Sequence, residues 1–319
     1  MVKYFLRKFL VIIIALVVAN FIGFSFAFLV SPQAMTGNPY AHGSAESFPV
    51  IPAYSNYLVQ VLHGDFGTTY SGENVLAVVE RVGMNSLGLM GIALLISVVG
   101  GLGLGRLSVR RNKRGIAPWL TVLSTIGLAS PAFYIAVLLI FLAIKIYLSG
   151  SVGDKGIPFI GFGWDTHLIL PVLALSLQPM VKIARLVGGL LADEMDKLYV
   201  QASLGFGMKF SQLKRKFAFR SIISSVIHVI AGSSRLMLAE LIIIERLFNW
   251  PGYGKLLGSI LSLGDTSADF LSPPMVAILI TILAAFFLLI DLVATSLARS
   301  LDPRLWGGME QEQAARSKV

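Results

Sequence analysis

The sequence has little charge for its length and no cysteine. Only 13% of its 319 residues are charged, whereas an average soluble domain has about 25%. Without cysteine the chain cannot form a disulfide, a thiolate metal site or a cysteine nucleophile. Apolar residues make up 55% of the sequence, and this composition indicates a membrane protein.

Motifs of a self-contained enzyme are also missing. The chain lacks G-x-x-x-x-G-K-[ST], so it has no loop of its own for binding the phosphates of ATP. It also lacks H-E-x-x-H and G-x-S-x-G. The four histidines, His42, His63, His167 and His228, are scattered along the chain. We therefore expect no catalytic residue, metal site or cofactor in this chain.

Six segments are long and apolar enough to cross a membrane, which takes roughly 20 residues of helix. They cover residues 9–30, 86–107, 117–147, 168–191, 222–244 and 274–297. The first segment could be a secretory signal, but its apolar run exceeds the usual length of about 7–15 residues, and no clear cleavage site follows. The sequence thus predicts an all-α integral membrane protein with six transmembrane helices.

Lysine and arginine alternate between rich and poor loops. They are frequent before residue 9, in 106–114, in 182–220 and after 298, and scarce in 31–85, 148–167 and 246–273. Because cytoplasmic loops carry the excess of basic residues, both termini are expected in the cytoplasm. This topology accounts for the net charge of +9, so nucleic-acid binding is not needed to explain it.

The spans suggest a division of the chain into four parts. Residues 1–30 form an N-terminal tail and the first helix, and residues 86–300 form the transmembrane core. Residues 301–319 form a cytoplasmic tail. Residues 31–85 contain several turn signals and five aromatic side chains, which favours a small outer lobe of short helices over a floppy loop.

The segment 245–261 combines a turn with a short apolar repeat. In Trp250-Pro251-Gly252-Tyr253-Gly254 the proline fixes φ, and the two glycines permit positive φ. The leucines and isoleucine that follow, up to Leu261, repeat at helical spacing. We expect a sharp turn and an amphipathic helix, with Trp250 in the interfacial belt. An ordinary loop with an interfacial tryptophan is the alternative.

The segment 192–221 opens with a short acidic run, then has a stretch rich in small residues from Leu198, and continues as a basic, amphipathic arm. The stretch after the acidic run reads "LYVQASLGFGMKF", in which small side chains would let a partner approach closely. In the arm, Leu213, Phe217 and Arg220 have i, i+4, i+7 spacing, which favours a helix. The residues alone leave two interpretations open, docking to a partner protein and binding to anionic headgroups.

Six stretches, in this order, resemble the permease subunit of an ATP-binding-cassette importer of the dipeptide/oligopeptide/nickel type. The resemblance extends over nearly the whole chain, and the stretches that carry it are "YFLRKFLVIIIALVVANFIGF", "YLVQVLHGDFGTTY", "ASPAFYIAVLL", "HLILPVLALSL", "IIIERLFNWPGYGKLL" and "SLDPRL". The fifth is similar to the family signature Glu-x-x-Phe-x-Trp-Pro-Gly-x-Gly. Its matching positions, which we assign to a turn at the outer mouth, are Glu245, Trp250, Pro251, Gly252 and Gly254.

The resemblance places the family's coupling motif, which docks on an ATPase subunit, in 192–221. Gly207 is expected to be needed because a β-carbon there would push the docked helix from its groove. The chain departs from the family pattern at Gly188, Leu198 and Phe206, where arginine, aspartate and lysine are usual. The candidate coupling residues are Tyr199, Val200, Ala202, Ser203, Gly205, Gly207, Ala218 and Arg220.

A further departure lies inside the fifth expected span, where Arg235 and Glu240 replace small residues. Ionisable groups at that depth are costly and face a cavity or a partner. Five residues apart on a helix, they point about 140° apart, so they are not expected to pair with each other. They line the translocation path or meet the partner permease, or else they form structural ion pairs with neighbouring helices. Asp291 corresponds to an asparagine of the family.

The resemblance implies a type I importer permease fold in the cell membrane. It implies a second, homologous permease subunit, two ATPase subunits that bind ATP and magnesium, and an extracytoplasmic substrate-binding protein. Peptides are the expected substrate, with nickel or another small solute as the alternative. A self-sufficient channel or secondary transporter is disfavoured, because no relay of buried carboxylates and no inverted repeat is evident.

Overall fold

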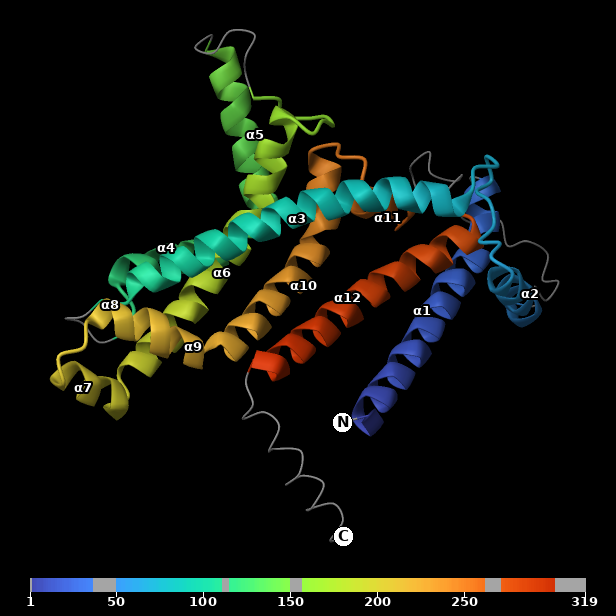
Figure 1. Ribbon diagram of the computed structural model, residues 1–319. Helices are drawn as coiled ribbons and strands as arrows, with labels where there is room; N and C mark the ends of the chain where they lie inside the picture. The colour runs from blue at the N-terminus through green and yellow to red at the C-terminus, as the bar shows by residue number, and fades with distance from the viewer. Residues whose placement is uncertain (1, 37–49, 111–114, 150–156, 262–270, 302–319) are drawn as a thin grey trace. The chain divides into compact units, whose positions relative to one another are not determined.

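The computed structural model describes residues 2–36, 50–110, 115–149, 157–261 and 271–301 (Figure 1). The regular secondary structure in these ranges is helical, apart from one isolated bridge between Thr68 and Asn74, and turns and irregular segments connect the helices. The predicted all-α fold is confirmed. The chain divides into two compact units, residues 1–87 with 249–289 and residues 88–248 with 290–319.

Five described stretches are helical and apolar enough to cross a membrane, and a bent pair of helices is a candidate for a sixth span. The five lie in α1 (Val2–Thr36), α3 (Val75–Ser108), η2 with α6 (Thr166–Met195), α10 (Ile223–Leu247) and α12 (Pro273–Leu301). The expected first span, 9–30, lies inside α1. Several apolar helices of this length make the chain a multi-pass membrane protein.

The third expected span, 117–147, is wrong as a single helix. It forms α4 (Pro118–Ala129) and α5 (Ala132–Leu148), which are bent by 94° at the break between them. Ser130 and Pro131 at the break are extended, with ψ of 107° and 150°. The proline ring disfavours helical backbone in the residue before it, and proline cannot donate to the preceding turn. The 94° bend separates the two helices at this point.

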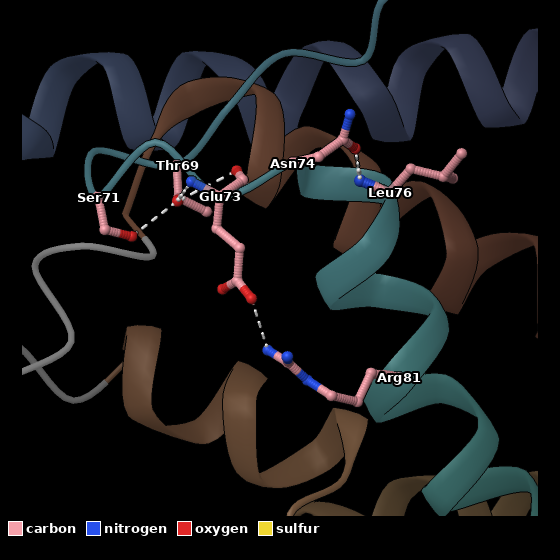
Figure 2. A network of polar contacts seen from close by, with 6 residues as sticks. All are labelled: Thr69, Ser71, Glu73, Asn74, Leu76 and Arg81. Carbon is pink, nitrogen blue, oxygen red and sulfur yellow. Dashed lines mark hydrogen bonds and ion pairs between the residues drawn. The ribbon is translucent and has the colours of Figure 1, made fainter.

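Helix α3 begins at Val75 and not near Ser86, because the turn before it supplies a cap. The Asn74 side chain accepts the N–H of Leu76 at 2.8 Å, as an N-cap does. Ahead of it, the Thr69 hydroxyl accepts the N–H of Glu73 at 3.1 Å. The Glu73 carboxylate then reaches Arg81, two turns into the helix, at 3.1 Å (Figure 2). These contacts fix a compact entry to α3.

In the first unit, α2 (Val50–Leu62) packs on α1 through aromatic rings. Phe24 stacks on Tyr57 with ring centroids 5.0 Å apart, and Tyr54 meets the edge of the same phenylalanine at 5.4 Å. Asn20 at this contact accepts the Tyr54 hydroxyl and donates to Thr281 of α12 at 2.9 Å. Residues 37–49 of the expected outer lobe lie outside the described residues.

In the second unit, α6 (Ile169–Met195) packs against α4, α5 and α10 (Figure 1). Small residues let α3 approach it closely. A β-carbon on Gly105 would lie 2.8 Å from the Ala184 carbonyl oxygen, and one on Gly188 would lie 2.7 Å from the Ser108 hydroxyl. Such contacts are typical of membrane helices that pack backbone to backbone. They account for glycine at 188, where the family resemblance suggests arginine.

Candidate functional site

The segment expected to couple to an ATPase begins with a short helix that a glycine closes. Helix α7 covers Leu198–Gly205. The carbonyl of Leu204 accepts the N–H of Gly207 at 3.0 Å, and that of Ser203 accepts the N–H of Met208 at 3.2 Å. This is the Schellman arrangement, which needs a left-handed residue after the C-cap. Gly207 has φ of 84° and no atom within 4 Å of its β-carbon position, so its backbone angle is the reason for glycine within this chain.

One side of α7 is anchored to the end of α6. Val200 is fully buried among apolar residues of α6 and of the following arm. The Tyr199 hydroxyl donates to the Glu194 carboxylate at 2.7 Å, and the Lys197 ammonium meets its other oxygen at 2.6 Å. The helix is therefore held in place by packing and by two polar contacts, although it has only eight residues.

The other side of α7 is apolar and exposed. Leu198 is 82% exposed and Phe206 is 89% exposed, one at each end of the helix. Tyr199 and Met208 add partly exposed apolar surface between and beside them. We call these four side chains the exposed face of α7. Large apolar side chains that stay exposed near one another on a folded chain are typical of an interaction site.

The basic arm after α7 does not form the uniform helix that its spacing suggested. It consists of α8 (Phe210–Gln212), a π-helical stretch (Leu213–Ala218) and α9 (Phe219–Ser221). Leu213 and Ala218 are buried, whereas Phe217 is 49% exposed and Arg220 is also exposed. The segment is helical, as the spacing of Leu213, Phe217 and Arg220 predicted. In its π-helical stretch the hydrogen bonds run from i to i+5, and the buried pair is Leu213 and Ala218.

Two cationic side chains join this arm to α3. The Lys214 ammonium donates to the carbonyl oxygens of Arg106 at 2.9 Å and Val109 at 3.1 Å, near the end of α3. The guanidinium of Arg106 lies 3.7 Å above the Phe219 ring, a cation–π contact. Burial, and secondarily the Arg106 charge, lowers the pKa of Lys214 below its usual 10.5. The sequence showed only that the arm is basic and gave no sign of these contacts.

The turn at 249–254 packs inward, contrary to expectation. Trp250 is fully buried and not interfacial. Its indole N–H donates to the Asn85 carbonyl at 3.2 Å, and the Asn85 side chain donates back to the Pro251 carbonyl at 2.8 Å. Buried tryptophans need such a partner for the indole nitrogen. The partner is far away in sequence, so local composition could not indicate it.

The left-handed residue of this turn is Asn249 and not a glycine. Asn249 has φ of 58°, and its side chain accepts the Lys255 ammonium at 2.5 Å. Neither Gly252 nor Gly254 has positive φ, so the expectation for these glycines is wrong. Gly254 lies inside α11 (Tyr253–Leu261), the predicted amphipathic helix. Glu245, the first residue of the signature, is buried at the end of α10.

Arg235 and Glu240 have different partners on different helices. The Arg235 guanidinium meets the Asp291 carboxylate of α12 at 3.3 Å, and these side chains are 42% and 49% exposed. Glu240 accepts the backbone N–H of Ala132, the first residue of α5. A carboxylate there offsets an unpaired N–H and the positive end of the helix dipole. Glu240 thus helps to hold the α4–α5 break.

The described residues contain no group of three or more His, Asp or Glu side chains placed to hold a metal ion. Among the described residues, His167 and Asp165 form a close contact between a histidine and an acidic side chain. The imidazole Nδ1 lies 2.6 Å from the carboxylate. The Asp165 side chain also accepts the His167 N–H at 3.0 Å, which is a local turn contact.

Comparison with known proteins gives one family and several full-length relatives. Residues 97–307 match the family described as binding-protein-dependent transport system inner membrane component. The chain is 25% identical to the oligopeptide transport system permease protein OppB of Mycobacterium tuberculosis, over 96% of this chain and 99% of the relative. The dipeptide transport system permease protein DppB of Lactococcus lactis and the glutathione transport system permease protein GsiC of Salmonella typhi match with the same identity and coverage.

Proposed function

Because the chain belongs to the family of binding-protein-dependent transport system inner membrane components, we propose that it is a permease subunit of an ATP-driven importer of dipeptides or oligopeptides. The peptide permeases among its full-length relatives support this substrate class. In this proposal the chain supplies half of the translocation pathway and pairs with a second, homologous permease. Two ATPase subunits and an extracytoplasmic binding protein complete the complex.

The exposed face of α7 is the observation that carries the coupling role. We propose that it docks in a groove of an ATPase subunit. Leu198 and Phe206 stand at the two ends of a helix whose other side is anchored to α6 through Val200. Fully burying one such apolar side chain is worth about 1.5–3 kcal/mol. A rigid helix with an apolar anchor at each end suits a surface that must transmit motion.

Two of the three departures from the family pattern, Leu198 and Phe206, fall on the exposed face itself. Leu198 and Phe206 stand where the resemblance suggests aspartate and lysine, so this face is more apolar than the family pattern. The partner groove should accordingly offer apolar surface at both ends. Specificity for one ATPase of a pair would arise from this match, because a polar groove would be left with unpaired groups.

The turn at 249–254 has a different task in this proposal. It would face the binding protein, together with the segment before α3. Since Trp250 and the Pro251 carbonyl are engaged within the chain, their role is to fix the shape of the outer surface. Exposed neighbours would make the contact.

The experiment that tests this proposal replaces one anchor by a charge. In the Phe206→Asp variant the ATPase subunits should copurify at less than a tenth of the wild-type yield, and ATP-driven peptide uptake should be lost. The control is Leu62→Asp, which places the same charge on a second exposed apolar residue. Leu62 is 85% exposed and ends α2. Wild-type ATPase recovery with Phe206→Asp would rule out docking through this face.

A further inference from the structure

One face of α10 carries small and polar residues that are exposed or half-exposed, although the helix is long and apolar enough to span a membrane. Its residues follow one another at intervals of three and four, the spacing of a single helix face. They are Ser225, His228, Gly232, Arg235 and Ala239, all exposed or half-exposed. We call them the α10 stripe. The stripe contains no large apolar side chain.

The exposed surface of α5 is the opposite in character. Val137 and Leu138 are each 48% exposed, and Phe141 is 56% exposed. Such a surface is suited to hydrocarbon. Lipid cannot cover the α10 stripe in the same way, because an uncompensated polar or charged group in hydrocarbon is costly. The stripe must therefore face water, substrate or another protein chain.

The charge on the stripe lies at the middle of the helix. Arg235 is the central residue of α10 (Ile223–Leu247), so by helix geometry it lies about 18 Å from either end. Its partner Asp291 is on α12, and about half of each side chain remains accessible. The ion pair is thus held between two helices but not enclosed by them. At mid-membrane depth such an arrangement is a marker of a functional path.

We propose that the α10 stripe borders the aqueous translocation path, and that Arg235 contacts the carboxylate of the passing substrate. This inference rests on the proposed transport function and names the chemical group that the path recognises. One guanidinium nitrogen, Nη1, is held by Asp291 at 3.3 Å. The other, Nη2, lies toward Gly232, at 4.0 Å from where a β-carbon would stand. A guanidinium offers paired donors that match a carboxylate.

Asp291 gives the site a second property that transport requires. It positions the guanidinium and offsets part of its charge, so a substrate carboxylate would be attracted but not held tightly. Conduction needs a site that is favourable to enter and weak enough to leave. A lone arginine at this depth would bind an anion more strongly and release it more slowly.

A chain without cysteine allows a direct test of water access. The Gly232→Cys and Ser225→Cys variants should be modified, in the assembled complex, by membrane-impermeant charged methanethiosulfonate reagents. Gly232→Cys has room, because its β-carbon would meet only the Arg235 side chain at 4.0 Å. Val137→Cys on α5 is the matched control and should stay unmodified. Modification of Gly232→Cys only after the complex is taken apart would overturn the proposal in favour of a subunit contact.

The charge of Arg235 is tested by the choice of reagent. The quantity to compare is the reaction rate of an anionic reagent divided by that of a cationic reagent. In Gly232→Cys this ratio should be about tenfold higher than in the double variant Gly232→Cys/Arg235→Gln. An unchanged ratio would show that Arg235 does not act on anions in the path. This readout needs no transport, so it is informative even if the substrate class is different.

Substrate recognition is tested with a peptide pair. Uptake of trialanine by the complete importer should fall at least fivefold in Arg235→Gln, whereas uptake of trialanine amide, which has no carboxylate, should be unchanged. Equal loss for both peptides would refute carboxylate recognition. If the wild-type importer takes up neither peptide in an ATP-driven way, this would instead count against peptide transport itself. The thiol measurements would still decide whether the stripe faces water.

Discussion

The helix α7 and the turn at 249–254 are both segments outside the long helices that resemble family motifs. They differ in whether their large apolar side chains are exposed or buried. In α7 the large apolar residues Leu198 and Phe206 are 82% and 89% exposed, whereas in the turn Trp250 is fully buried. The first arrangement leaves free energy available for binding a partner. The second uses its largest side chain for internal packing. A motif of matching residues can therefore mark either a contact surface or the framework that supports one.

The largest effect is expected from Trp250→Ala. Truncation of a fully buried tryptophan leaves a cavity and should cost about 3–5 kcal/mol of unfolding free energy, seen as a lower Tm of the purified protein. Trp119→Ala, at a residue that is 37% exposed, should cost clearly less. If Trp250 were instead a contact residue, Tm would be unchanged and stimulation of ATP hydrolysis by the binding protein would be lost.

Gly207→Val should have the next largest effect, and mainly on coupling. A β-branched residue with positive φ is strained by about 1–3 kcal/mol, so the Schellman closure of α7 should open. ATP hydrolysis stimulated by the binding protein should fall to near the basal level, while membrane insertion stays normal. Gly207→Asn tolerates left-handed backbone and should keep most of the activity. Equal loss in both variants would show that a β-carbon at 207 itself interferes with docking.

A β-branched residue can also be placed at the left-handed position of the turn at 249–254, which is Asn249. The expected effect on stability is smaller. Asn249→Val should lower the unfolding free energy by about 1–2 kcal/mol, because its φ of 58° is unfavourable for a β-branched residue. Asn249→Gly should be nearly neutral in Tm. A large loss with glycine would mean that the contact between Asn249 and Lys255, and not the backbone angle, holds the turn.

The smallest effect concerns the pH dependence contributed by Lys214. Burial lowers the pKa of Lys214 in the folded protein below 10.5, its usual value in the unfolded chain. Between these two values the unfolded chain binds more protons than the folded one, so this residue makes stability rise with pH. The Tm of the wild type minus the Tm of Lys214→Met, measured as a function of pH, should rise slightly with pH just below pH 10.5. A downward slope would contradict the burial of the ammonium.

Some features of the fold could be predicted because they depend on nearby residues. The apolar runs indicated the long helices, and the spacing up to Leu261 indicated α11. Other features depend on distant contacts. The inward position of Trp250 comes from Asn85 and Pro251 together, and the π-helical arm packs Leu213 and Ala218 on α6 while Lys214 reaches the end of α3. Neither is readable from local pattern.

The break at Pro131 is an intermediate case. The proline was visible, but the apolar length of 117–147 favoured a single span, because proline is tolerated in membrane helices when neighbours satisfy the freed backbone groups. Here Glu240 does this from α10, and the helix direction changes by 94°. The sequence showed an unusual carboxylate in the fifth span but not that its partner was the N–H of Ala132.

The contacts of the basic arm with α3 have a mechanical consequence. Val200 ties the coupling segment to α6, and Lys214 and Arg106 tie it to α3 through short contacts. In the proposed coupling role, the segment would connect two membrane helices, α6 and α3. A force on α7 would then be transmitted to both helices together. Loss of one of these contacts should leave only the other helix following a displacement of α7.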